Sequence, residues 1–118
     1  MFKVTKIRIP IYHGILRVVL TDDFEESAKC LKIDNEGHNL SSLGAFVCTS
    51  TDKNAETNFN VFFRPDVQHD LIAHEVVHLV NAIYVSRCIS LDPRNDEPQA
   101  YLTGWITGQV YRTIENLK

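Results

Sequence analysis

The residues best suited to chemistry are His74, Glu75 and His78, which stand together in the segment HEVVH. The segments on either side, DLIA and LVNAI, are apolar with helical periodicity, so the three residues are predicted to lie on a helix. Positions four apart on a helix are roughly 6 Å apart along its axis and share one face. Two imidazoles at this spacing can bind one metal ion, while the adjacent carboxylate can act as a base.

The ion that this spacing favours is zinc, because HExxH is typical of a zinc-binding helix. Apolar residues surround the helix predicted for residues 66–87 almost completely, which predicts that it is buried at the centre of the fold. Burying three polar side chains without partners would cost about 1 to 3 kcal/mol each, and more for the carboxylate. The alternative is a pair of core histidines that happen to share a face.

Glu97 is the predicted third ligand, because a tetrahedral zinc site with an open position takes three protein ligands. The helix that carries it begins at about Asp96, with Pro98 in its first turn, where a missing amide hydrogen is not needed. Glu97 follows His78 by nineteen residues, and a short connection would let the two helices pack antiparallel. The alternative role for Glu97 is an acidic first-turn residue that the helix dipole favours.

The segments HEVVH and DEPQAY together resemble the gluzincins, the group of zinc metallopeptidases to which thermolysin belongs. The step from Glu97 to Ala100 is similar to that of the small ImmA/IrrE-like zincins, which phages and mobile elements often encode. This resemblance covers residues 66 to about 110. It implies a zincin-like fold, a Zn²⁺ cofactor held by His74, His78 and Glu97, and a protein or peptide substrate.

The implied reaction is hydrolysis of a peptide bond by metal-activated water, with Glu75 as the general base. A hydrogen-bond donor would help to stabilise the tetrahedral oxyanion. Tyr101 is the first candidate for this donor, because it lies one helical turn after Glu97. His69 is the second candidate, and Asn81 is a candidate partner for a ligand histidine. Tyr101 and His69 are equally compatible with ordinary surface roles. The substrate would lie along a sheet edge, offered by the strand Asn58–Arg64 or by its hairpin partner.

Two other classes of function remain open from the residues alone. A non-catalytic zinc-stabilised domain would use the same ligands for folding or for binding a partner. The 118 residues contain no second lobe of the kind that supplies an oxyanion donor in thermolysin-like members, and this favours the non-catalytic alternative. Another zinc amide hydrolase, such as an amidase or deformylase, is the third class. A deformylase is disfavoured because the segment FVCTS around Cys48 matches its ligand motif poorly.

The surrounding pattern predicts one α+β domain over residues 1–118, with a minimal zincin-like fold. Four strands are expected, at residues 2–12, 15–20, 43–50 and 58–64, of which the last two form a hairpin. Helices are expected from the TDDFEE segment through about Leu31, over residues 66–87, and from about Asp96 to the end. A sheet of about four strands, antiparallel or mixed, should pack on the first helix and on the HExxH helix.

The composition of the chain limits the partners and the cellular compartment that can be predicted for this domain. Twelve Lys and Arg are scattered among fifteen Asp and Glu, and a net charge of −3 without a basic cluster argues against a nucleic-acid partner. No span is apolar enough to cross a membrane, and the first residues alternate as a strand does, unlike a signal peptide. Three widely spaced cysteines fit buried thiols in a reduced, cytoplasmic protein, including that of a phage-infected bacterium. The pattern predicts no oligomeric state.

Overall fold

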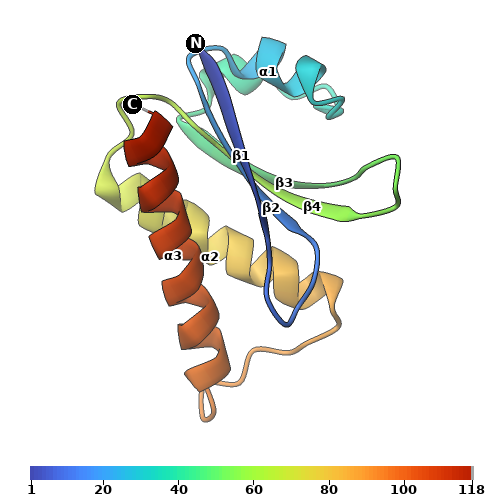
Figure 1. Cartoon of the computed structure of the whole chain (residues 1–118), viewed down its shortest axis with the longest axis vertical. Helices are drawn as coiled ribbons and strands as arrows, with labels where there is room; N and C mark the ends of the chain where they lie inside the picture. Colours follow the sequence, from blue (N-terminus) through green and yellow to red (C-terminus); the bar gives the residue numbers. More distant parts are fainter. Residues whose placement is uncertain (118) are drawn as a thin grey trace.

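The computed structural model describes residues 1–117 and shows a mixed sheet packed against helices on both faces (Figure 1). The fold is α+β, as predicted. In chain order the elements are β1 (Phe2–Arg8), β2 (Ile15–Thr21), α1 (Phe24–Cys30), a short 3-10 turn (Leu40–Ser42), β3 (Ala45–Thr51), β4 (Thr57–Phe63), α2 (His69–Ser86) and α3 (Glu97–Leu117). Asp23 caps α1 by accepting a hydrogen bond from the Glu26 amide, in agreement with the predicted acidic start.

The order of strands across the sheet is β1-β2-β4-β3. The β1–β2 and β3–β4 pairs are antiparallel hairpins, whereas β2 and β4 are parallel. A parallel pair needs a long crossover, and here that connection contains α1 and β3. The predicted hairpin is therefore confirmed, with β4 inside the sheet and β3 at its edge.

Alternation along the strands divides the core into two layers. One side of β2 and β4 packs against α2 and α3, which cross in Figure 1; on these helices the buried apolar residues recur every three or four positions. The other side, including Val19 and Phe62, packs against Phe24 and Ala28 of α1 and against Leu40. The sheet thus lies between α1 on one face and the α2–α3 pair on the other.

The first strand is shorter than predicted, because β1 ends at Arg8 and residues 10–12 form a turn. Ile9 is buried, but Ile11 has a φ of 67° and is 83 % exposed, so the strand alternation predicted for residues 2–12 does not continue to Ile11. Pro10 removes a backbone donor and favours the turn, which is closed by a hydrogen bond from the Tyr12 amide to the Pro10 carbonyl.

The helix α2 begins at His69, three residues later than predicted, and is buried on one side only. Its buried apolar residues include Ile72, Val76, Leu79, Val80 and Ile83, while Val77 is 55 % and Val85 77 % exposed. The prediction of a fully buried central helix was therefore wrong. The sheet and α3 do not enclose α2 completely, and His74 and His78 are exposed.

The three cysteines carry no disulfide in the described chain. Cys48 is half-buried, but Cys30 and Cys88 are exposed, so the prediction of buried thiols was wrong for these two. No helix within residues 1–117 is both long and apolar enough to cross a membrane.

Candidate metal centre

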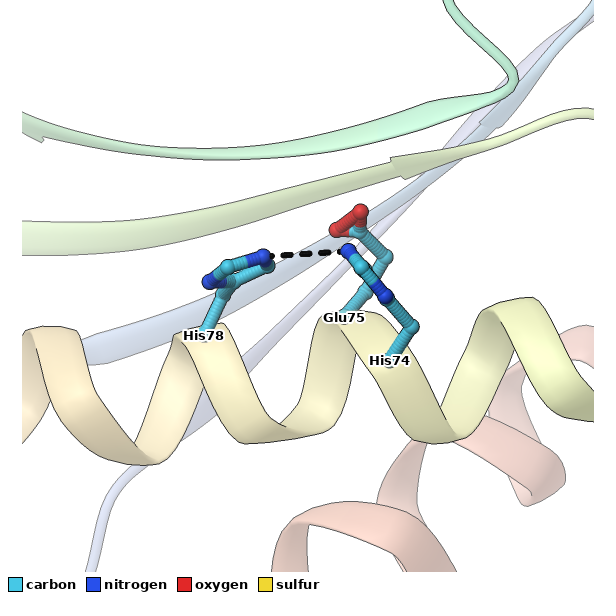
Figure 2. A group of neighbouring side chains, drawn as sticks. All are labelled: His74, Glu75 and His78. Atoms are coloured by element: carbon cyan, nitrogen blue, oxygen red, sulfur yellow. Dashed lines mark hydrogen bonds between the residues drawn. The ribbon is translucent and has the colours of Figure 1, made fainter.

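The side chains of His74, Glu75 and His78 gather on one stretch of α2, and Figure 2 shows them pointing from the helix toward the strands. Their ligand atoms lie within 4.8 Å of one another, and the described residues contain no other such group of three. The two imidazole Nε2 atoms are 3.1 Å apart. The predicted convergence of the two histidines is therefore confirmed, and the group can hold a metal ion.

The separation of the two nitrogens suits a shared ion. Two nitrogens bound tetrahedrally to zinc at about 2.0 to 2.1 Å are roughly 3.3 Å apart, close to the separation of these Nε2 atoms. Without an ion the same contact is a hydrogen bond, in which one ring donates from Nε2 and the other accepts. The helix thus places the two Nε2 atoms close to the separation that a shared ion requires.

Glu75 differs from its two neighbours because its side chain turns inward. The residue is 4 % exposed, and its Oε2 is the one buried side-chain oxygen or nitrogen of the described chain without a hydrogen-bond partner. Burial raises the pKa of the Glu75 carboxyl, an effect that the nearby His78 and His74 partly oppose. A buried carboxylate oxygen without a partner, beside two imidazoles, fits a site that receives a cation or a polar ligand.

A hollow of about 590 Å³ lies beside this group, between α2 and the edge strand β3. The helix contributes Glu75, His78 and Asn81 to its wall, together with two apolar residues, Ala82 and Val85. The opposite wall is formed mainly by β3. Asn81 thus lies near the histidines as predicted, although it forms no hydrogen bond to His78 in the structure. The sequence left open whether β4 or its hairpin partner β3 would form this wall, because strand alternation does not reveal which strand is the edge.

Glu97 and Tyr101 are not brought to the histidines. Glu97 is exposed at the first position of α3 and lies outside the His74–Glu75–His78 group. Both residues line a different hollow, formed with the turn at Pro10 and Tyr12. Tyr101 is 76 % exposed. The α3 helix packs on α2 through its buried apolar side, and its first turn lies beside the β1–β2 turn.

His69, the second candidate for an oxyanion donor, contacts Tyr111 of α3. Its Nδ1 lies 2.6 Å from the hydroxyl of Tyr111, and the two rings stack with their centroids 5.5 Å apart. This contact joins the first turn of α2 to α3. Its partner on α3 gives His69 a structural role in the described fold.

Comparisons with models of protein families, with curated proteins and with solved structures found no match to this chain. The geometry of the site and the sequence pattern are therefore the basis on which a function is proposed.

Proposed function

We propose that this chain is a zinc-dependent metallopeptidase that hydrolyses peptide bonds at the His74–Glu75–His78 group. One observation carries the proposal: two Nε2 atoms 3.1 Å apart stand beside a buried carboxylate oxygen that has no partner. A pair of surface histidines alone would not require an acidic neighbour to be buried. An acid of this kind is costly unless it serves a ligand.

The roles follow from the positions of the side chains. His74 and His78 hold the ion through Nε2. Zinc, when bound, supplies a Lewis acid that lowers the pKa of water and polarises a carbonyl. Glu75 accepts a proton from water and delivers it to the leaving nitrogen, and the raised pKa of its carboxyl brings it closer to the range in which a general base works at neutral pH.

The substrate in this proposal is an extended peptide bound beside β3. One side of β3 pairs with β4, and no described strand covers the other side, so its backbone groups can pair with a further strand. The hollow between β3 and α2 would receive side chains from such a peptide next to Glu75 and His78. Of the two strands predicted as the substrate edge, only β3 is free.

The proposal assigns two protein ligands, His74 and His78, and no third. The sequence predicts Glu97, with Tyr101 as an oxyanion donor, but both line the hollow beside Pro10. A zinc ion held by two histidines alone has positions left for water or another ligand. The position of Glu97 in another hollow favours a second candidate function. In this function the group binds a metal ion to stabilise the fold or to bind a partner, and it catalyses no reaction.

The first test is the metal content of the purified protein. We expect about one zinc per chain after reconstitution and dialysis, and loss of that zinc in His74→Ala and His78→Ala. His38→Ala is the matched control, because it removes an imidazole from a loop away from α2. Zinc retained equally by all three variants would refute the site.

The second test separates catalysis from metal binding. Glu75→Gln keeps the size of the side chain but removes the base, so it should keep zinc and lose cleavage of a fluorogenic peptide library. Cleavage by Glu75→Gln at the parent rate would refute the assigned role. Zinc binding without cleavage of any peptide by the parent would favour the non-catalytic candidate.

A further inference from the structure

A second hollow, beside the β1–β2 turn, lies apart from the metal centre, and none of His74, Glu75 and His78 lines it. Its volume is about 600 Å³, and it lies between that turn and the first turns of α3, at the lower end of the molecule in Figure 1. Glu97 and Tyr101, for which the sequence predicted roles at a zinc ion, line this hollow instead. The chemistry of its walls suggests a different role for both residues.

Three of the residues that line the hollow are aromatic. Tyr101 and Trp105 come from α3, where they share one face with Glu97 because the three positions are four residues apart. Tyr12 comes from the β1–β2 turn, and its ring packs against that of Tyr84 with the centroids 5.8 Å apart. The remaining lining residues are apolar: Pro10, Ile11, Pro98 and Leu102. Two distant segments of the chain thus form aromatic and apolar walls.

Glu97 is the one charged residue in this lining, and no Lys, Arg or His accompanies it. The ion pairs of the described chain, Met1–Asp22 and Arg8–Glu56, do not include Glu97. The lining therefore carries a negative charge, and the faces of aromatic rings carry negative potential as well. Both features favour a cation as the ligand.

The β1–β2 turn is held in place by hydrogen bonds of its backbone. The Tyr12 amide donates to the Pro10 carbonyl at 2.6 Å, and Arg87 Nε donates to the Tyr12 carbonyl at 2.6 Å. Ile11 has a φ of 67°, which is unfavourable for a β-branched residue, and its side chain is 83 % exposed. Tyr101 on α3 is 76 % exposed. Each of the two segments thus presents one large apolar side chain to solvent at this hollow.

We propose that the hollow binds an arginine side chain of a peptide or protein partner. A guanidinium is planar, stacks on aromatic rings and donates hydrogen bonds to a carboxylate, so the aromatic walls and Glu97 together match it. A small free ligand is normally enclosed over most of its surface, whereas Ile11 and Tyr101 are largely exposed. A chain that continues on either side of the arginine can cover these two side chains. The proposal goes beyond the metal centre and does not depend on it.

The test uses the single tryptophan of the chain, Trp105, because it lines the hollow. The full-length protein is titrated with acetyl-Leu-Arg-Leu-amide at constant ionic strength, and tryptophan fluorescence is recorded. We expect a saturable change with a dissociation constant of about 1 mM. The same peptide with citrulline in place of arginine keeps the shape but lacks the charge, and it should bind at least about fivefold more weakly.

The variants test the assignment to the walls of the hollow. Tyr101→Ala should weaken binding at least about fivefold, whereas Tyr101→Phe keeps the ring and should bind as the parent does. Glu97→Gln should weaken binding about two- to fivefold. Glu115→Gln neutralises a glutamate near the other end of α3 and should leave binding unchanged. All three positions are exposed, so each variant should fold, and circular dichroism checks this.

The outcomes that overturn the proposal concern the charge of the ligand and the aromatic wall. These are absence of a saturable change in Trp105 fluorescence, equal binding of the citrulline peptide, and binding by Tyr101→Ala equal to that of the parent. Tetramethylammonium chloride is titrated in parallel and should bind more weakly than the arginine peptide. Binding of this salt as tightly as the peptide would identify a free cation as the ligand and overturn the assignment to a peptide.

Discussion

The burial of Glu75 makes a quantitative prediction about the metal-free protein. Glu75→Gln keeps the shape of a side chain that is 4 % exposed, but it removes a charge that has no hydrogen-bond partner at Oε2. The Gln amide occupies the same buried position and is still polar, so the difference between the two proteins is the cost of burying the charge itself, taken as about 1 to 3 kcal/mol. For a chain of this length that corresponds to a rise of about 4 to 12 °C in Tm for the variant. A substitution at a proposed active site is thus expected to stabilise the fold.

The pH dependence of this gain follows from the direction of the pKa shift. Burial raises the pKa of Glu75 above its ordinary value of 4.5, so the folded protein binds the proton more tightly than the unfolded chain. The stability of the parent therefore falls as the pH rises from about 4.5 through the raised pKa. Gln cannot ionise. The advantage of Glu75→Gln should grow as the pH rises above the ordinary value and disappear below it.

The assay is thermal unfolding of chelator-treated parent and variant at pH 7 and at pH 4, followed by circular dichroism. Glu115→Gln on α3 is the matched control, because it neutralises an exposed glutamate and should leave Tm nearly unchanged. Added zinc should reduce the gain, since a nearby cation favours the charged carboxylate. If metal-free Glu75→Gln melts at or below the temperature of the parent at pH 7, the reasoning from the unpartnered oxygen is refuted.

Three further predictions test the positions of other side chains. Glu97→Ala should weaken zinc binding far less than either histidine substitution, because Glu97 lies outside the His74–Glu75–His78 group. Zinc titration measures this difference. An equal loss of zinc binding would show that α3 moves to supply Glu97, the ligand predicted from the sequence. Ile106→Ala should destabilise the fold by about 2 to 5 kcal/mol in urea unfolding, whereas Val77→Ala, at a 55 % exposed position, should cost far less. Cys48 should react with a thiol reagent more slowly than the exposed Cys30 at pH 8, because burial raises the pKa of the Cys48 thiol; equal rates would contradict its half-buried position.

Local sequence pattern was sufficient for the features that depend on spacing along one element. The helical repeat around HEVVH placed His74 and His78 one turn apart, and a turn of helix brings two imidazoles together whatever packs nearby. The hairpin of β3 and β4 follows in the same way from a polar turn between two alternating segments. The boundaries of β1 and α2 were less accurate, because Pro10 and Pro65 end or delay an element within an otherwise continuous pattern.

Only the tertiary structure decided how these elements face one another. The parallel pairing of β2 with β4 puts β3 at the edge, and packing of α3 on one side of α2 leaves both histidines exposed while Glu75 is buried. The same packing keeps Glu97 away from them, in the hollow beside Pro10. Periodicity specifies which side of an element is apolar, but the contacts between distant segments depend on the summed packing of the whole chain.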